Sequence, residues 1–168
     1  GSSGIGAATA RLAAARGYIV CLSYRSNAAA AAAVVADIER AGGEAVAVQA
    51  DVASEAEVLR LFAAVDARPG RLAVLVNNAA ILERQTTLLD MEAARWQRVL
   101  ATNVIGSFLC AREAVRRMST RHGGAGGAIV NVSSMAARLG SPGEYVDYAA
   151  SKGAIDSMTI GLAKEVAT

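Results

Sequence analysis

The sequence has very few of the residues that build metal sites and disulfides. It contains two cysteines, Cys21 and Cys110, and one histidine, His122, in 168 residues. Cys21 falls in an apolar, strand-like run and Cys110 on the apolar side of an expected helix, so both are predicted to be reduced core thiols. No second cysteine or histidine stands near either of them at ligand spacing, and we therefore expect no metal site.

Long apolar runs and an excess of charge of one sign are also missing. No run reaches the ~18 residues of a membrane span, and no signal peptide is recognisable. Lysine and arginine number 17 against 15 acidic residues, and the formal net charge is +2. We therefore expect neither nucleic acid nor a membrane as a partner, and the expected location is cytoplasmic.

The rest of the sequence alternates between two hydrophobic periods. Strand-like runs cover residues 18–24, 45–50, 72–76 and 128–132. Helix-like stretches cover residues 7–16, 27–41, 54–67, 91–119 and 145–166. Strands separated by helices of this length predict an α/β fold, a doubly wound parallel sheet with helices on both faces. The runs 18–24 and 72–76 are expected to be buried, and residues 1–168 to form a single domain.

Two of the predicted helices begin with capping residues. Asn27 precedes an alanine-rich helix, and its side chain is able to accept a hydrogen bond from the first turn. Ser54 precedes the next helix, and Glu57 follows three residues later, which is the spacing of a capping box.

A glycine-rich turn, Gly1-Ser2-Ser3-Gly4-Ile5-Gly6, leads directly into the first helix. Small residues let a ligand approach the backbone, and the free N–H groups of a first helical turn attract an anion. Such a turn normally follows a strand. We therefore expect a first strand to lie before Gly1 in a longer protein.

In sheets of this kind the ligand lies across the carboxyl ends of the strands. The first predicted strand ends in Tyr24-Arg25-Ser26. Arg25 suits a 2′-phosphate, so NADP(H) is favoured over NAD(H); a solvated arginine in a turn is the alternative. The next strand ends at Asp51-Val52, where the carboxylate is placed to accept from an adenine amino group or simply to begin a turn.

Tyr148 and Lys152 lie four residues apart at the start of the last helix, and therefore on one face of it. A fixed positive charge stabilises the phenolate of a neighbouring tyrosine, which suits Tyr148 to proton transfer. A Tyr and a Lys at a helix rim is the plainer interpretation. The same face continues as an apolar stripe that is expected to be buried, with Ile155, Met158 or Thr159, Leu162 and Val166.

Further polar side chains stand at positions that are otherwise apolar. Asn77 and Asn78 end the third predicted strand, and Ser133 and Ser134 follow the fourth. Asn103 belongs to the long helix, where its expected buried neighbours are Trp96, Val99, Leu100, Val104 and Phe108. A buried amide must be hydrogen-bonded, so each of these asparagines is expected to have specific partners.

Together these motifs resemble the short-chain dehydrogenase/reductase family, in its compact single-domain branch of 3-oxoacyl-carrier-protein reductase-like and glucose dehydrogenase-like oxidoreductases. The resemblance implies a Rossmann-type sheet whose first strand and C-terminal part lie outside residues 1–168. Ala80 departs from the family pattern, in which glycine is usual at this position. The motifs, in the family's order, are Gly4-Ile5-Gly6, Asp51-Val52, Asn77-Asn78-Ala79-Ala80, Asn103, Ser133-Ser134, and Tyr148 with Lys152.

The resemblance implies hydride transfer between NADP(H), or NAD(H), and a small carbonyl or alcohol substrate. Ser134 would hold the carbonyl oxygen and Tyr148 would transfer the proton. Lys152 would assist Tyr148 and bind the nicotinamide ribose, while Asn103 would stabilise a helix irregularity and a bound water. Ser133 is the alternative to Ser134, because the spacing from Ser134 to Tyr148 is one residue longer than in many relatives. The implied cofactor-binding residues are Ser3, Gly4, Ile5, Gly6, Tyr24, Arg25, Ser26, Asp51, Val52, Asn77, Ala79, Tyr148 and Lys152.

Two other functions compete with this one. The extended epimerase/dehydratase branch also uses a Tyr-x-x-x-Lys pair, but the residues 77–80 motif and the serine pair argue against it. A non-enzymatic cofactor-sensing protein usually loses a catalytic residue. Here all four catalytic positions are filled, by Asn103, Ser134, Tyr148 and Lys152. The family resemblance also implies a homodimer or homotetramer built on the last two long helices, whose small residues are Ala149, Ala150, Gly153, Ala154 and Gly161.

Overall fold

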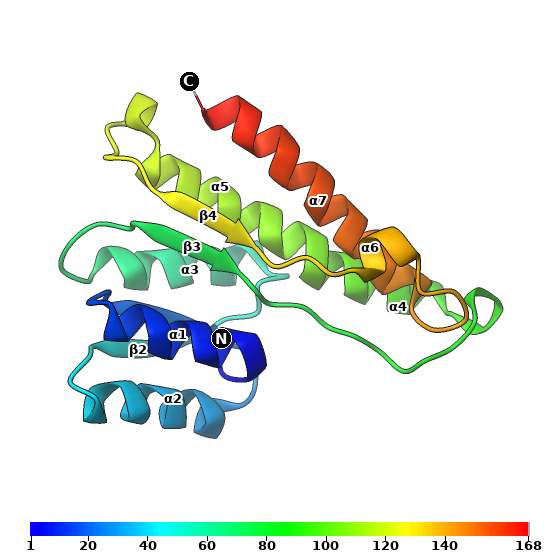
Figure 1. Ribbon diagram of the computed structural model, residues 1–168, viewed down its shortest axis with the longest axis horizontal. Helices are drawn as coiled ribbons and strands as arrows, with labels where there is room; N and C mark the ends of the chain where they lie inside the picture. The colour runs from blue at the N-terminus through cyan, green and yellow to red at the C-terminus, as the bar shows by residue number, and fades with distance from the viewer. Residues whose placement is uncertain (168) are drawn as a thin grey trace. The chain divides into compact units, whose positions relative to one another are not determined.

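The computed structural model of the protein describes residues 1–167 (Figure 1). The chain divides into two compact units, Gly1–Arg71 and Leu72–Thr168. The expectation of a single domain concerns how these units associate, and it stays a prediction. Within the described residues each of the four strands has one hydrogen-bonded neighbour, β1 with β2 and β3 with β4.

The first unit is built from five elements in alternating order. They are α1 (Gly4–Ala15), β1 (Val20–Tyr24), α2 (Ala28–Arg40), β2 (Ala45–Gln49) and α3 (Glu55–Asp66). β1 and β2 are parallel, with Val20 opposite Ala45 and Tyr24 opposite Gln49. Parallel neighbours need a crossover, which α2 supplies. α3 contributes the buried Val58, Leu61 and Phe62. A buried cluster rich in alanine packs α1, β1 and α2 together, formed by Ala7, Ala10, Ala14, Leu22, Ala31, Val34 and Ile38.

One of the two predicted helix caps is confirmed and the other is wrong. The Asn27 side chain accepts a hydrogen bond of 2.9 Å from the Ala30 N–H, as expected. Ser54 precedes α3 but makes no side-chain capping bond. Glu57 does not complete a capping box, because its Oε2 reaches past Ser54 and accepts from the Asp51 N–H at 2.7 Å.

The second unit has the same alternation around a second pair of strands. Its strands are β3 (Val74–Asn77) and β4 (Ala128–Asn131), which are parallel with Asn77 opposite Asn131. Ala111 of α5 and Ile155 and Met158 of α7 form a buried cluster, with Ile129 packed against it. The helical elements are η1 (Leu88–Asp90), α4 (Ala93–Leu100), η2 (Ala101–Ile105), α5 (Gly106–Met118), η3 (Thr120–His122), α6 (Ala136–Leu139) and α7 (Val146–Val166).

All four predicted strands are present, but they are less buried than expected. In β1 only Leu22 is fully buried, and Tyr18, which was predicted to begin this strand, precedes it and is exposed. In β3 no residue is fully buried, and Val74 is exposed. The predicted α/β architecture of parallel strands joined by helices is confirmed, whereas complete burial of these two strands is not.

The predicted long helix is present, but its buried face differs from the predicted one. The helical run from α4 to α5 contains a π-helical turn, η2, which includes Asn103. Its buried side begins with Arg95, Val99 and Asn103, at four-residue spacing. The predicted buried stripe is therefore wrong for three large side chains: Trp96 is 37% exposed, Leu100 42% and Phe108 52%.

The apolar stripe of α7 is buried over only part of its length. Ile155 and Met158 are buried, as predicted, but Thr159 and Val166 are exposed. A helix of 21 residues is about 32 Å long, whereas the four-residue strand β4 spans only about 13 Å. The helix is therefore much longer than the strand, which its middle turns contact through Ile155, Met158 and Thr159.

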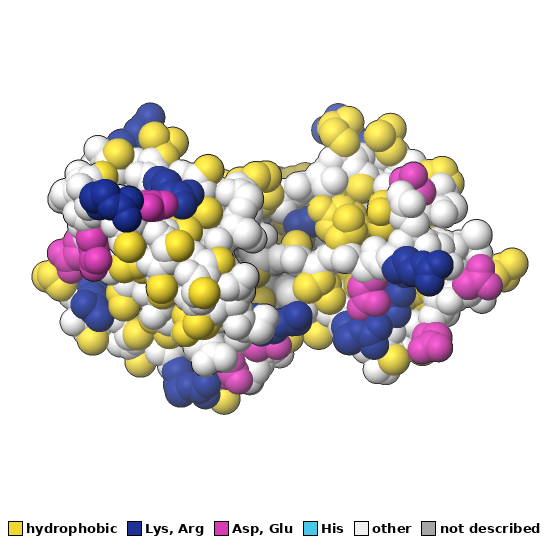
Figure 2. All heavy atoms as spheres, turned by 90° about the horizontal axis from the view of Figure 1, so that it is seen from below, with side chains coloured by type: hydrophobic (Ala, Val, Ile, Leu, Met, Phe, Trp, Pro, Cys, Tyr) yellow, Lys and Arg dark blue, Asp and Glu magenta, His cyan; other side chains and the backbone are white. Residues whose placement is uncertain are grey.

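Neither the cysteines nor the charges on the face shown in Figure 2 suggest a further site. Cys21 and Cys110 are free thiols, and burial raises the pKa of both, that of Cys110 to about 11. On the face shown in Figure 2, acidic and basic side chains lie intermixed, and no extended area carries one sign. Among residues 1–167, no helix is long and apolar enough to cross a membrane. The same residues contain no group of three or more histidine, cysteine and acidic side chains arranged to hold a metal ion.

Candidate functional site

The glycine-rich turn forms the N-terminus of α1 in the first unit. Gly4 has a φ of +51°, a conformation that favours glycine. Ser3 precedes the helix without capping it through its side chain, and the first hydrogen bond runs from the Ala7 N–H to the Ser3 carbonyl at 3.2 Å. The N–H groups of Gly4, Ile5 and Gly6 therefore have no acceptor within the helix, which suits this turn to an anion.

The carboxyl end of β1 places Arg25 at the surface of the first unit. Tyr24 is half-buried against the core, and its carbonyl accepts from the Ala50 N–H at 2.9 Å. The Arg25 carbonyl accepts from the Gln49 side-chain amide at 3.1 Å, so the backbone is fixed while the guanidinium is exposed. Ser26 follows as an exposed residue. An exposed, fixed arginine at a strand end is consistent with phosphate binding.

Asp51 begins a turn, which was the plainer of its two interpretations. Its Oδ1 accepts from the Ala53 N–H at 2.9 Å, and its carbonyl accepts from the Ser54 N–H at 3.0 Å. Val52, the next residue, is buried. One carboxylate oxygen is thus engaged in the turn, and the role of Asp51 toward an adenine stays a prediction.

Asn77 finds the hydrogen-bond partners that were predicted for it, and these hold the second unit together. Its Nδ2 donates to Asn131 Oδ1 at 2.9 Å and to the Ser107 carbonyl at 3.3 Å. Asn131 in turn donates to Thr159 Oγ1 at 2.9 Å. This chain of amides joins β3, β4, α5 and α7 at the carboxyl ends of the strands. Ala79, two residues after Asn77, is half-buried.

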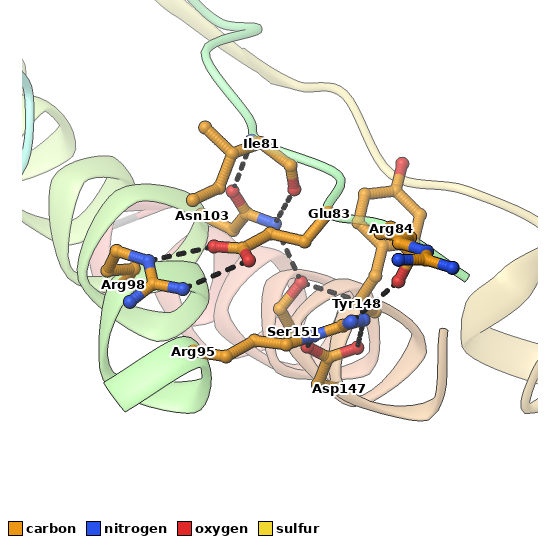
Figure 3. A network of polar contacts seen from close by, with 9 residues as sticks. All are labelled: Ile81, Glu83, Arg84, Arg95, Arg98, Asn103, Asp147, Tyr148 and Ser151. Atoms are coloured by element: carbon orange, nitrogen blue, oxygen red, sulfur yellow. Dashed lines mark hydrogen bonds and ion pairs between the residues drawn. The ribbon is translucent and has the colours of Figure 1, made fainter. Parts of the chain in front are cut away.

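Asn103 lies in the π-helical turn and is almost completely buried. It brackets one residue of the segment that follows β3: its Oδ1 accepts from the Ile81 N–H at 2.7 Å, and its Nδ2 donates to the Ile81 carbonyl at 3.0 Å. Nδ2 also donates to Ser151 Oγ at 3.1 Å, as Figure 3 shows. The predicted helix irregularity at Asn103 is therefore present, and its amide links two segments.

The two candidate serines use their hydroxyl groups differently. Ser133 Oγ donates to the Lys152 carbonyl at 3.4 Å. Ser134 Oγ accepts from the Ala136 N–H at 3.2 Å, at the start of α6, and this bond leaves its own proton available. The geometry favours Ser134 as the donor to a substrate oxygen, while Ser133 remains the alternative.

Lys152 is buried beside Tyr148. The Lys152 side chain donates from Nζ to the Val132 carbonyl at 2.7 Å, and the residue is only 4% exposed. Nζ lies 5.7 Å from the centre of the Tyr148 ring. Burial lowers the pKa of Lys152, and the negative charge of Asp156 opposes this shift. The pair is therefore not at an exposed helix rim, and it places an ammonium group next to a phenol.

The sequence interpretation missed a buried ion pair next to Tyr148. Arg95 of α4 and Asp147 of α7 form two hydrogen bonds of 2.7 and 3.0 Å (Figure 3). The hydrogen bonds from Arg95 lower the pKa of Asp147 despite the opposing effect of burial. Ser151, between Tyr148 and Lys152, was missed as well. The available signal was spacing, since Arg95 occurs four residues before Val99 and eight before Asn103, on the buried face.

The six predicted residues of the second unit lie in or just after four elements, β3, η2, β4 and α7: Asn77, Ala79, Asn103, Ser134, Tyr148 and Lys152. Two hydrogen bonds join the end of β4 to α7, from Ser133 Oγ to the Lys152 carbonyl and from Lys152 Nζ to the Val132 carbonyl. The residues from the glycine-rich turn to Val52 belong to the first unit. A phenol, a buried ammonium and a hydroxyl with a free proton form a set that can bind and protonate a carbonyl oxygen.

The chain is similar to known proteins over its whole length. A family model described as short chain dehydrogenase matches residues 1–168. The chain is 58% identical over 167 residues to "Uncharacterized oxidoreductase YgfF" of Escherichia coli (strain K12), covering 99% of this chain and 68% of that protein. It is 42% identical over 167 residues to a 3-oxoacyl-[acyl-carrier-protein] reductase of Synechocystis, covering 99% of this chain and 66% of that protein.

A solved structure is similar over the same extent. It is a short chain dehydrogenase from Burkholderia cenocepacia in complex with NADP, with a TM-score of 0.87 and 35% identity. The similarity covers 99% of this chain and 66% of that one. The chain thus spans about two thirds of the length of the proteins that it matches.

Proposed function

Since this chain belongs to the short-chain dehydrogenase/reductase family, we propose that it forms the cofactor-binding and catalytic part of an oxidoreductase that transfers a hydride between NADP(H) and a carbonyl or alcohol substrate. The membership confirms the family resemblance, the Rossmann-type fold and the class of NAD(P)-dependent oxidoreductases acting on CH–OH groups. The observation that carries the proposal is the buried Lys152 ammonium beside the Tyr148 ring.

The residues of the first unit fit the phosphate groups of a dinucleotide. The open first turn of α1, with Ser3, Gly4, Ile5 and Gly6, would hold the pyrophosphate through its N–H groups. Arg25 would hold the 2′-phosphate, which favours NADP(H), with NAD(H) as the weaker alternative. The relative from Burkholderia cenocepacia, which was solved with NADP, supports this choice.

The remaining cofactor contacts are assigned from the family pattern. Tyr24 and Ser26 would adjoin Arg25, and Asp51 and Val52 would contact the adenine. In the second unit Asn77 and Ala79 would contact the cofactor from the end of β3. Because the Asn77 amide is already engaged with Asn131 and Ser107, its contribution would come mainly from the backbone. When bound, the cofactor supplies or accepts the hydride.

The chain's own residues would handle the proton and the substrate oxygen. Ser134 would donate a hydrogen bond from its hydroxyl group to the carbonyl oxygen. Tyr148 would act as general acid in reduction and as general base in oxidation. Lys152, held by the Val132 carbonyl, would stabilise the phenolate and hydrogen-bond the nicotinamide ribose. Asn103 would keep the helix irregularity that orients the segment opposite α7.

Assembly as a homodimer or homotetramer is part of the proposal. Ile105 and Phe108 are large exposed apolar side chains near the start of α5. On α7, a side-chain carbon at Gly153 or Gly161 would meet nothing within 4 Å, so these positions leave open space. Exposed apolar surface and small residues suit contact with a second copy. A dimeric or tetrameric mass of the full-length protein in light scattering is expected, and a monomeric mass would contradict it.

The reaction is tested with the full-length protein and a panel of carbonyl compounds. Ketones, quinones, sugars and the 3-oxoacyl thioester acetoacetyl-CoA are incubated with NADPH or NADH, and the absorbance of the reduced cofactor is followed. We expect net oxidation of NADPH by at least one compound. Tight cofactor binding with no net oxidation in any reaction would instead favour an epimerase or a cofactor-sensing protein. The predicted cytoplasmic location requires a separate test by fractionation.

A further inference from the structure

The buried ion pair between Arg95 and Asp147 has no part in the proposed proton transfer, yet it adjoins Tyr148 directly. Arg95 lies in α4, and Asp147 immediately precedes Tyr148 in the first turn of α7. Their side chains are only 7% and 5% exposed. Two N–H···O hydrogen bonds join them, so the pair has the bidentate geometry that fixes orientation as well as distance.

Arg95 also makes a third hydrogen bond, to a different part of the chain. Its Nη1 donates to the Arg84 carbonyl at 2.6 Å, as Figure 3 shows. Arg84 belongs to the segment that follows β3, in which Ile81 is held by Asn103. A single guanidinium therefore connects α4, residues 81–84 and the start of α7.

The connections through Arg95 and Asn103 reach Tyr148 from its two sides. Asn103 donates to Ser151 Oγ, and Ser151 Oγ donates to the Tyr148 carbonyl at 2.7 Å. Arg95 holds Asp147, the residue before Tyr148. The turn that carries the phenol is thus tied to residues 81–84 once before Tyr148 and once after it (Figure 3).

We propose that Arg95 and Asp147 are positioning residues, whose ion pair fixes the first turn of α7 against residues 81–84 and so places the Tyr148 hydroxyl for proton transfer. This inference rests on the proposed function of Tyr148. Displacement of a reacting group on the order of 1 Å can cost about 10²-fold in rate. A small movement of this turn is therefore enough to affect turnover.

Replacing both partners separates positioning from fold stability. Removal of one partner leaves a buried, uncompensated charge, whereas replacement of a buried pair by apolar residues of similar volume is often neutral or stabilising. The variant Arg95→Met/Asp147→Leu therefore removes both charges and the bond to Arg84 without leaving a buried charge. If the ion pair contributed only to the stability of the fold, this variant would have the kcat of the wild type.

A matched control exists one turn further along α4. Arg98 forms an equally bidentate pair with Glu83, at 2.9 and 3.0 Å, and so also ties α4 to the segment after β3. The Arg98 side chain is 56% exposed and its pair contains no residue of α7. The variant Arg98→Met thus tests the tether to α4 alone, without the connection to the turn that carries Tyr148.

The experiment uses the full-length protein with acetoacetyl-CoA and with the compound reduced fastest in the panel. Thermal midpoints, the Kd of NADPH and kcat are measured for the wild type, Arg95→Met, the double variant and Arg98→Met. We expect Arg95→Met to lose both thermal stability and turnover. The double variant should recover its thermal midpoint and keep an NADPH Kd within about twofold, while kcat stays about 10- to 100-fold low. Arg98→Met should change kcat by less than about twofold.

Hydrogen exchange supplies a readout that does not depend on activity. In the double variant the amides of residues 81–84 and 146–152 should exchange faster than in the wild type, while those of the first unit should not change. Wild-type kcat in the double variant, or unchanged exchange in these two segments, would overturn the inference. A wild type that reduces no compound would refute the proposed function instead, and the exchange measurement would still decide whether the ion pair orders this turn.

Discussion

The two units of the chain treat their polar side chains in opposite ways. All buried polar and charged side chains among the described residues belong to the second unit: Arg95, Thr102, Asn103, Ser107, Glu113, Asp147, Ser151 and Lys152. The buried side chains of the first unit are apolar: alanine, valine, leucine, isoleucine and the phenylalanine Phe62. Its ligand-binding candidates are backbone N–H groups at the start of α1 and the exposed Arg25.

This contrast separates two physical tasks. Binding an anion requires donors that face solvent and are already ordered, which a helix N-terminus provides without any buried polar group. Proton transfer requires side chains held at fixed positions in a low dielectric, which demands a fully satisfied buried network. Substitutions in the second unit should therefore affect turnover, and substitutions in the first unit should affect cofactor affinity and choice.

The sharpest test of this division is Tyr148→Phe in the full-length protein. The change removes one hydroxyl and leaves the helix, the packing and Lys152 in place. Since general acid–base catalysis contributes about 10²–10⁴-fold, kcat should fall by at least that range while the Kd of NADPH stays nearly constant. The control is Tyr145→Phe, at the N-cap of the same helix. Retention of a tenth or more of the activity by Tyr148→Phe would refute the role of this residue.

Lys152→Met is the expected exception to this division, because it should lower both kcat and the affinity for NADPH. The ammonium is hydrogen-bonded to the Val132 carbonyl, lies beside the Tyr148 ring and is assigned to the nicotinamide ribose. A charge-assisted hydrogen bond is worth about 1.5–3 kcal/mol, so NADPH affinity should fall by about 10- to 100-fold together with kcat. Lys164→Met, at the exposed end of the same helix, is the control. A loss in kcat alone would remove the ribose assignment.

Arg25→Ala, made in the full-length protein, tests the role of the first unit in cofactor choice. Loss of the guanidinium should weaken NADPH binding by about 10- to 100-fold and leave NADH binding and kcat at saturating cofactor almost unchanged. Fluorescence titration with each cofactor measures the difference, and Arg16→Ala, at the opposite end of α1, serves as the exposed control. Equal losses for the two cofactors, or a wild type that prefers NADH, would contradict the 2′-phosphate assignment.

The smallest effect is expected on stability at low pH. Hydrogen bonds from Arg95 lower the pKa of Asp147 in the folded protein, so the stabilisation is fully present above the ordinary aspartate pKa of about 3.9. It falls between that value and the lower, folded pKa, because in this range the unfolded chain is protonated while Asp147 of the folded protein still is not, and it is gone below the folded pKa, where both states are protonated.

Arg95→Met/Asp147→Leu removes this titration, and its thermal midpoint should decline less steeply below about pH 4 than that of the wild type, by a few degrees. Arg11→Ala, which breaks the exposed pair with Asp37, is the comparison variant. Identical acid profiles for the double variant and the wild type would show that Asp147 contributes nothing to acid stability.

The order of the elements was predictable because it depends on local patterns. Asn27 caps α2 through the expected bond, and the four strands occupy the expected parts of the sequence. Caps and hydrophobic periods act within a few residues and need no tertiary information. The predicted capping box is absent because Glu57 accepts from the Asp51 N–H, in the turn before the helix, and this partner could not be predicted from the spacing of Ser54 and Glu57.

The buried polar network could be predicted only in part. Asn103 and Asn77 stood out as amides among apolar residues, and both have the partners that were required. Arg95 was missed because an arginine in a polar stretch usually faces solvent, and because its partner lies 52 residues away. The large apolar side chains of α4 and α5 misled the assignment of the buried face, since Trp96 and Phe108 lie on the other side. Which face of a helix is buried is decided by what packs against it.

The π-helical turn η2 has a consequence for insertions and deletions in this helix. A turn that closes from residue i to i+5 contains one residue more than a regular α-helical turn. Deleting one residue from Ala101–Ile105 would therefore leave a continuous α-helix and keep the orientation of α5 relative to α4, because four residues of α-helix turn through about the same angle as five residues of π-helix. Ser107, whose carbonyl accepts from Asn77, and the buried Cys110 and Ala114 would keep their sides of the helix. The same deletion within α5 itself would rotate the residues that follow it by about 100° and turn their buried side chains away from their present neighbours.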